Sequence, residues 1–213
     1  MTESDISARP RAERTLWANR AGFGLAMATN SVFFLTLVMT RLLIAKGQVP
    51  AAVHPVTGLV LTVVMVGSAL VGRAAVAAIR DDRVSQARQR LLVTALLGTL
   101  VIVGGAVVWA TFPVPPTNLD VPASMVVHYG PTAYPATTMV PHPAGLYGQI
   151  FFTLTGLVAI ESLVGLGALW SHWLPARFAR LSPGNHWGLE SSVLFWEFLA
   201  LMWVVAYVVL YLI

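Results

Sequence analysis

Residues 91–112 read LLVTALLGTLVIVGGAVVWATF and contain no charged side chain. An α-helix rises about 1.5 Å per residue, so about 20 residues of this kind cross the hydrocarbon core of a bilayer. Four further long and mostly apolar stretches lie near 21–43, 56–78, 146–170 and 189–213. None of the five alternates as the strands of a membrane β-barrel do. The sequence therefore predicts an all-α polytopic membrane protein, a five-transmembrane-helix bundle that forms a single membrane domain over residues 1–213.

The composition supports a lipid environment. Of the 213 residues, 57% are hydrophobic and 10% are charged, against roughly 25% charged in an average soluble domain. The mean hydropathy is +0.74. This balance excludes an ordinary soluble enzyme and also a disordered chain. The sequence has no cysteine, which excludes disulfides, thiolate zinc sites and iron–sulfur clusters. The net charge of +4 comes from an excess of arginine. In a membrane protein such an excess usually marks the cytoplasmic segments. We therefore expect no nucleic-acid partner.

Basic residues are distributed unevenly among the segments between the spans. If the N-terminus is cytoplasmic, 11 of the 13 basic residues lie on the cytoplasmic side, namely Arg9, Arg11, Arg14, Arg20, Arg73, Arg80, Arg83, Arg88, Arg90, Arg177 and Arg180. Arg41 and Lys46 lie on the other side. The positive-inside rule therefore predicts a cytoplasmic N-terminus and a C-terminus outside.

The longest connection, residues 113–145, carries eight of the thirteen prolines and no basic residue. Proline interrupts helices, so no long helix is expected there. The loop also holds His128, His142 and Asp120. We interpret it as an ordered outer flap that packs on a partner, with metal binding by these side chains as the alternative.

The five histidines lie in loops or at the ends of spans. A haem inside the membrane needs axial ligands, usually histidines, that project inward from facing helices. We therefore expect no haem, no metal and no catalytic residue in this chain.

Two carboxylates lie inside predicted spans, Glu161 in the fourth and Glu197 in the fifth, and Glu190 stands at the cytoplasmic start of the fifth. Ionisable groups inside a bilayer are costly and normally face the bundle and pair. Glu161 and Glu197 fall at similar depths, and no arginine or lysine is expected at that depth. They are thus a candidate intramembrane pair that handles protons, fixes helix packing, or contacts a neighbouring subunit or lipid headgroup. Asn30 in the first span belongs to the same polar set.

Two C-terminal motifs carry a resemblance to a known family. The first is YGQIFFTLTG, from Tyr147 to Gly156, in which Tyr147, Gly148 and Gly156 are motif positions. The second is HWGLESSVLFWEFLALMWVVAYVVLYL, from His186 to Leu212, with motif positions His186, Gly188, Glu190, Trp196, Phe198, Trp203 and Tyr207. The stretches NSVFF at 30–34 and Arg83 to Gly98 are weaker matches. In this order the motifs resemble the cytochrome c oxidase subunit III family in its five-helix bacterial form.

The chain departs from the family pattern inside the membrane. Asn30 replaces the family's acidic residue in the first motif. Val158 and Glu161 stand where the family has two histidines after its Thr–Gly pair, and Glu197 stands where it has the histidine of its Trp–His–Phe run. These changes put in doubt any proton or lipid role attributed to the family residues.

The resemblance implies a non-redox accessory subunit of a respiratory haem–copper terminal oxidase, not catalytic by itself, in a bacterial cytoplasmic membrane. It implies that the complex is a proton-translocating cytochrome c or quinol oxidase. Haem and copper would belong to partner subunits, the largest subunit and the copper-bearing subunit. The chain would stabilise the catalytic subunit, bind structural lipids, and support oxygen access and proton uptake. The alternatives are the homologous accessory subunit of a nitric oxide reductase and a small transporter or channel.

The topology can be tested on single-cysteine variants, because the chain has no cysteine of its own. A cysteine introduced at Asp120 should react with an impermeant thiol reagent added to intact cells, and one introduced at Asp81 should not. The reverse labelling pattern would contradict the orientation.

Overall fold

The computed structural model describes residues 11–43, 49, 53–112, 126–129, 132–135, 145–174, 178–179 and 181–213. Within these residues, five helices are long and apolar enough to cross a membrane. They are α2 (Arg11–Leu43), α3 (Pro55–Arg80), α4 (Val84–Ala110), α5 (Gly145–Trp173) and α7 (Trp187–Tyr207), which continues into the π-helical segment η3 (Val208–Leu212). The predicted five-helix membrane bundle is confirmed.

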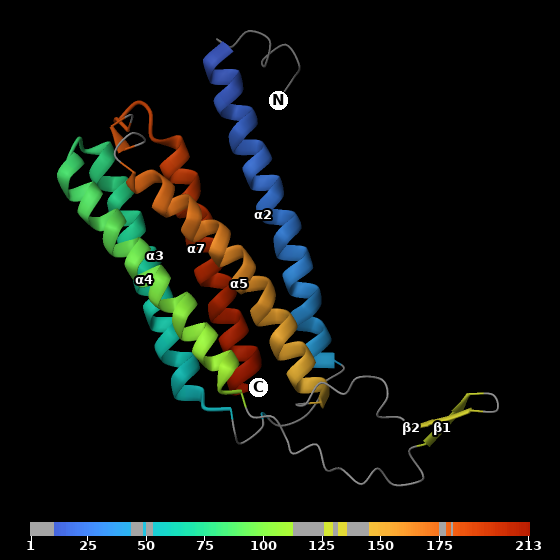
Figure 1. Cartoon of the computed structure of the whole chain (residues 1–213). Helices are drawn as coiled ribbons and strands as arrows, with labels where there is room; N and C mark the ends of the chain where they lie inside the picture. Colours follow the sequence, from blue (N-terminus) through green and yellow to red (C-terminus); the bar gives the residue numbers. More distant parts are fainter. Residues whose placement is uncertain are drawn as a thin grey trace.

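Four of the helices form a closed bundle, and the fifth lies against its side. Figure 1 shows α3, α4, α5 and α7 side by side, with α2 diverging from them toward its N-terminal end. Consecutive helices run in opposite directions, so the start of α2, the α3–α4 turn and the α5–α7 connection lie at one end of the bundle.

The helices extend beyond the predicted spans, mostly at that same end. The first begins at Arg11 and not near residue 21, and the third begins at Val84 and not near residue 91. Seven of residues 11–20 are arginine, alanine, glutamate or leucine, which favour helix, but the segment is not apolar enough to mark a span. Hydropathy therefore located the membrane-crossing parts but not the helix ends. Between α3 and α4, Asp82 has a φ of 57°, a left-handed conformation that aspartate tolerates better than most residues.

Basic side chains gather at the end where α2 begins. The Arg20 guanidinium lies 5.0 Å from the ring centroid of Trp187 at the start of α7. Arg88, on the first turns of α4, lies 5.4 Å from the ring of Trp173 at the end of α5. This arrangement agrees with the charge asymmetry, and the side of the membrane that this end faces stays a prediction.

A short β-hairpin occurs in the connection between α4 and α5. Strand β1 (Val126–Tyr129) pairs antiparallel with β2 (Thr132–Pro135), with Val127 opposite Tyr134. The sequence predicted no strand here, because scattered prolines hide a pattern of only four residues. Asp120 and His142 lie outside the described residues, so the alternative of a metal site in this loop is untested.

The core is organised around Trp196 of α7, whose side chain is 0% exposed. Its indole Nε1 donates a hydrogen bond to Ser68 Oγ on α3 over 3.0 Å. Ser68 Oγ in turn donates to the backbone oxygen of Thr94 on α4 over 2.9 Å. Within a membrane each such polar group needs a partner from the protein, so this chain of bonds connects three helices.

Glycines let the neighbouring helices approach the Trp196 ring. A Cβ atom placed on Gly98 of α4 would lie 2.6 Å from the ring carbon Cζ2, and one on Gly165 of α5 would lie 3.0 Å from Cε3. Small residues of this kind permit close helix packing where the hydrophobic effect is weak. Thus α4 and α5 contact opposite parts of a single buried indole.

Two tyrosines near the C-terminus, Tyr207 and Tyr211, pack toward α3. The rings of Tyr207 and Tyr211 stack at 5.5 Å between centroids. A Cβ on Gly58 of α3 would lie 2.9 Å from either ring. The glycine creates the space that draws both rings into the bundle.

We predict that Gly98→Ala destabilises the bundle by about 1–3 kcal/mol, because the added methyl group overpacks against a rigid indole. The matched control is Gly105→Ala on the same helix, where an added Cβ has no atom within 4 Å. That change should be neutral or stabilise by about 0.5–1 kcal/mol through helix propensity. Reversible unfolding in mixed micelles measures both, and equal stability of the two variants would contradict the prediction.

Candidate functional site

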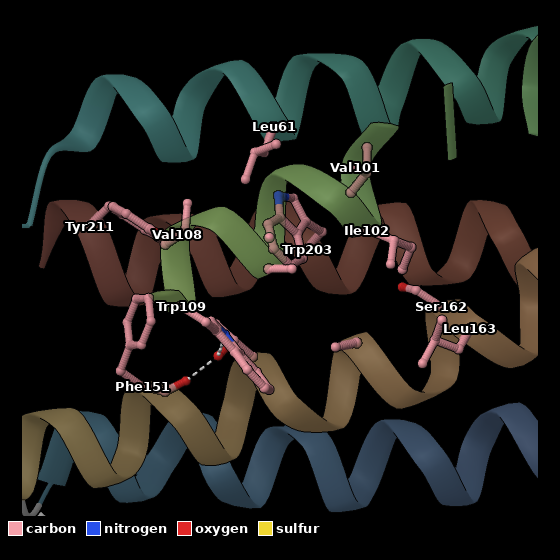
Figure 2. Close-up of a pocket in the computed structure, with 14 residues that line it drawn as sticks. Leu61, Val101, Ile102, Val108, Trp109, Phe151, Ser162, Leu163, Trp203 and Tyr211 are labelled. Atoms are coloured by element: carbon pink, nitrogen blue, oxygen red, sulfur yellow. Dashed lines mark hydrogen bonds between the residues drawn. The ribbon is translucent and has the colours of Figure 1, made fainter. Parts of the chain in front are cut away.

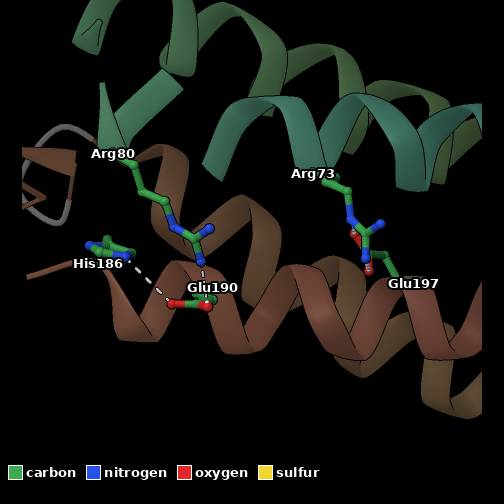
Figure 3. A network of polar contacts seen from close by, with 5 residues as sticks. All are labelled: Arg73, Arg80, His186, Glu190 and Glu197. Atoms are coloured by element: carbon green, nitrogen blue, oxygen red, sulfur yellow. Dashed lines mark hydrogen bonds and ion pairs between the residues drawn. The ribbon is translucent and has the colours of Figure 1, made fainter. Parts of the chain in front are cut away.

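An arginine and a glutamate bind each other through two hydrogen bonds on the face shared by α3 and α7. Arg73 donates from Nε to Glu197 Oε1 over 2.8 Å and from Nη2 to Oε2 over 2.8 Å. The Arg73 side chain is 70% exposed and that of Glu197 is 21% exposed. The pair therefore lies at the bundle surface, and Figure 3 shows it between α3 and α7.

A second arginine–glutamate pair follows toward the end of the bundle. Arg80 Nη2 contacts Glu190 Oε1 over 2.6 Å, and His186 Nε2 lies 3.5 Å from Glu190 Oε2. Both arginines are seven residues apart on α3, and both glutamates are seven apart on α7. Because the two helices are antiparallel, equal spacing aligns both pairs along one seam.

These pairs overturn part of the prediction for Glu197. The expectation that it has no basic partner is wrong, because Arg73 lies at the same level. Arg73 is seven residues from Arg80, or about 10 Å along the helix. In the sequence, Arg73 counts toward the predicted cytoplasmic charge excess, but its spacing from Arg80 also repeats the spacing of Glu190 and Glu197. That shared heptad interval was the signal that could have revealed the seam.

Glu161 has a different partner. Its carboxyl group on α5 lies within hydrogen-bonding reach of the Asn30 side chain on α2. Its Oε2 atom is buried and has no hydrogen-bond partner among the described residues. The predicted Glu161–Glu197 pair is therefore replaced by two separate pairs, Arg73–Glu197 and Asn30–Glu161.

The position of Glu161 is deeper than that of the charged seam. It lies twelve residues before Trp173, the last residue of α5, or about 18 Å along the helix. Both residues of the Asn30–Glu161 pair are half-buried. A polar contact at this depth can bridge α2 to the bundle, because hydrocarbon offers these groups no other partner.

The motif residues at the start of α7 shape its contact with the end of α5. His186 is the residue that precedes the first turn of α7. A Cβ on Gly188 would lie 3.3 Å from Cε1 of His172 on α5, a tight approach. The ring Nε2 of His172 is 3.2 Å from Ser192 Oγ. Phe198 packs against the buried core from the same helix.

The motif residues near the other end of the bundle also make defined contacts. The Tyr147 hydroxyl donates to the backbone oxygen of Leu210, and its ring lies 5.3 Å from the guanidinium of Arg41. Gly148 is buried. Gly156 leaves room for the Trp109 ring, whose Nε1 donates to Thr155 Oγ1 over 3.1 Å. The first motif thus joins α5 to α2, α4 and η3.

No three histidines, aspartates or glutamates come together as a metal site within the part of the chain that the structure describes. His54 precedes α3 at one end of the bundle, whereas His172 and His186 lie at the other end. These positions agree with the sequence observation that histidines avoid the middle of the spans. The geometry described so far is that of a polytopic helical membrane protein with inter-helix polar contacts.

Comparison with known proteins shows a similarity in the C-terminal part of the chain. Residues 131–213 match the family model described as Cytochrome c oxidase subunit III. The chain is 28% identical over 67 residues to cytochrome c oxidase subunit 3 of Papio hamadryas, covering 32% of this chain and 26% of that protein. It is 31% identical over 71 residues to the Synechocystis protein of the same name, covering 32% of this chain and 29% of the relative.

Through residues 131–213 the chain is similar to the cytochrome c oxidase subunit III family, and the resemblance stated from the sequence is confirmed there. The matched part spans about a quarter of the length of these curated relatives. Residues 131–213, matched by the family model, contain both C-terminal motifs. The two weaker stretches, at 30–34 and at Arg83 to Gly98, lie outside the matched range, so likeness to the family there stays a prediction.

We predict that Glu197→Leu alone destabilises the bundle by roughly 1–3 kcal/mol, because it leaves Arg73 without its carboxylate partner within a membrane-spanning helix, where an exposed side chain meets lipid and not water. The double variant with Arg73→Leu as well should be more stable than Glu197→Leu, since apolar groups can replace both members of a pair. Unfolding in mixed micelles measures these differences.

The control for this series is Asp81→Asn at the exposed Asp81–Arg83 pair, where side-chain exposures are 58% and 47%. Such pairs contribute little, so a change within about 0.5 kcal/mol is expected. Strictly additive effects of the two leucine substitutions would show that Arg73 and Glu197 do not stabilise each other.

Proposed function

We propose that this chain is a non-redox accessory subunit of a respiratory haem–copper terminal oxidase, resembling cytochrome c oxidase subunit III. The observation that carries the proposal is the family match of residues 131–213. It falls on α5 and α7, where the motif residues make specific contacts. Trp196 connects α7 to α3, α4 and α5, and Tyr147 connects α5 to η3.

The proposal assigns the redox groups to partner subunits. Haems and copper would be bound by the largest subunit and by the copper-bearing subunit, and this chain would stabilise the former from within a bacterial cytoplasmic membrane. Support comes from His54, His172 and His186, which lie at the ends of the bundle and not at its centre. Oxygen access, lipid binding and support of proton uptake are the finer roles that the family resemblance implies.

The rival interpretations make different demands on the structure. A transporter or channel needs a polar path through the bundle, whereas the seam of Arg73–Glu197 and Arg80–Glu190 runs along its surface. The accessory subunit of a nitric oxide reductase would use the same fold. The metal content of the intact complex separates this rival from an oxidase.

The test is to purify the complex from its native membrane in mild detergent through an affinity tag on this chain. An oxidase subunit should co-purify with haem and copper in fixed ratio, and the spectrum of the complex should show a haem that binds carbon monoxide in its reduced state. Haem with non-haem iron but without copper would indicate a nitric oxide reductase instead. Recovery of the chain free of haem proteins would contradict the proposal.

Within this function we predict a structural role for Glu161. Glu161→Gln should give a normal amount of complex with normal turnover, because an amide can also bond with Asn30. Glu161→Leu should reduce the assembled complex several-fold, since Asn30 then lacks its partner inside the membrane. The double variant Asn30→Leu with Glu161→Leu should recover part of the loss.

Yield of haem-containing complex and loss of activity during turnover measure this role. A Glu161→Gln complex that assembles normally, but takes up protons slowly or inactivates during turnover, would overturn the structural role and identify Glu161 as a proton-handling group.

A further inference from the structure

The two ion pairs between α3 and α7 lie at different depths in the membrane. Helix α3 has 26 residues, so it is about 39 Å long, against about 30 Å for the hydrocarbon core of a bilayer. With α3 centred in the bilayer, Arg80 at its last residue lies about 19 Å from the midplane, and Arg73 lies about 8 Å from it. The Arg80 pair is therefore at the level of the lipid headgroups, whereas the Arg73 pair is at the level of the lipid tails.

The guanidinium of Arg73 is held away from the headgroups. An arginine in a membrane helix usually extends its long side chain toward the polar surface. Here two hydrogen bonds of 2.8 Å hold the guanidinium against the carboxylate of Glu197, as Figure 3 shows. Glu197 lies about 4 Å from the middle of the helical stretch Trp187–Leu212. The Arg73 guanidinium therefore stays among the lipid tails, beyond the reach of a lipid phosphate.

Part of this guanidinium is neither paired nor covered. An arginine side chain carries five N–H groups. The bonds to Glu197 use one on Nε and one on Nη2, and the other three have no partner among the described residues. The Arg73 side chain is 70% exposed, so the bundle itself does not cover them. Inside hydrocarbon an unpaired N–H is costly, and an acceptor on another molecule removes that cost.

Apolar side chains flank the Arg73–Glu197 pair. Leu70 stands about one turn before Arg73 on α3 and is 62% exposed. Leu194 and Leu201 stand about one turn to either side of Glu197 on α7 and are 37% and 63% exposed. Membrane helices associate through van der Waals packing and hydrogen bonds between helices. The face formed by these leucines and the ion pair offers both.

The charge of the pair selects the kind of acceptor. Arg73 and Glu197 carry opposite charges, so the face has no net charge at this depth. A carboxylate from outside would add an uncompensated negative charge within the hydrocarbon, which is costly. The side chains of asparagine, glutamine, serine and threonine supply an acceptor oxygen without a charge.

We propose that the α3–α7 face, defined by Arg73, Glu197, Leu70, Leu194 and Leu201, docks a transmembrane helix of another polypeptide. That helix presents the side-chain oxygen of an asparagine, glutamine, serine or threonine to Arg73 and packs on the leucines. Its assignment to a partner subunit of an oxidase rests on the proposed function, whereas the docking face rests on the contacts of this chain.

The experiment replaces Leu70 or Leu201 by the photoreactive amino acid benzoylphenylalanine in the full, affinity-tagged chain, and irradiates intact cells of the native host. Each position should form a covalent adduct with a helix of one other membrane polypeptide, identified by mass spectrometry. An asparagine, glutamine, serine or threonine should lie within about two helical turns of the adduct. The matched control position is Val103 on α4, which is 55% exposed and lies outside this face. It should give no adduct with that helix.

The double variant Arg73→Leu with Glu197→Leu removes the polar contact and leaves an apolar face. Cross-linking from position 201 should fall about tenfold, as expected for the loss of a hydrogen bond from a charged donor. The matched control is Asp81→Asn with Arg83→Gln, which removes an ion pair at the α3–α4 turn, away from this face. It should cross-link normally.

Several results would overturn the docking face. They are adducts with lipid alone at both positions, a second copy of this chain as the captured polypeptide, a captured helix without an uncharged acceptor near the adduct, and undiminished cross-linking in the leucine double variant. The photoreactive positions leave Arg73 and Glu197 intact, so the first three results do not depend on the folding of that variant.

Failure of the docking face and failure of the proposed function give different results. Haem and copper that co-purify with the chain, without a polypeptide cross-linked at position 70 or 201, contradict the docking face alone. A mapped helix with its acceptor, in a complex that contains no haem, supports the docking face and contradicts the proposed function.

Discussion

The bundle depends on the burial of one indole. Trp196 fills the space between four helices because Gly98 and Gly165 have no side chains there, and its N–H is paired with Ser68, which is bonded in turn to the Thr94 backbone. Inside a membrane, packing and internal hydrogen bonds replace the hydrophobic effect as the forces between helices. A single large ring surrounded by small residues supplies both, so it fixes how near and at what level α3, α4, α5 and α7 meet.

The charged seam follows from that packing. With α3 and α7 held antiparallel, the heptad spacing of Arg73 and Arg80 matches that of Glu190 and Glu197, and two ion pairs form at the bundle surface. The Asn30–Glu161 contact joins α2 to α5, and α2 is the helix that packs least against the others. The same packing leaves a cavity of about 200 Å³ (Figure 2), lined by Gly105, Ala159 and Trp203 among others, because larger side chains at Gly105 and Ala159 would fill it.

The spans could be predicted from the sequence, because a run of about 20 mostly apolar residues is typical of a helix that crosses a membrane. The resemblance to the family rests on residues such as Trp196, Glu190 and Tyr147, which lie within the matched residues 131–213. The sequence did not reveal the true partner of Glu197, since depth estimated from helix ends treats each helix separately. Pairing depends on which faces meet, and that is set by contacts such as Trp196 with Gly98. The strands β1 and β2 were not predicted, because each has only four residues. That length is too short to show a clear alternation of apolar and polar residues.

A high-resolution structure of the complex isolated from its native membrane through this chain tests the central claim most directly. The account predicts that the chain contacts a haem- and copper-bearing subunit, ligates neither group, and retains the Trp196–Ser68 bond between α7 and α3. A haem or metal ligated by residues of this chain, or a complex without a haem-bearing partner, would contradict it.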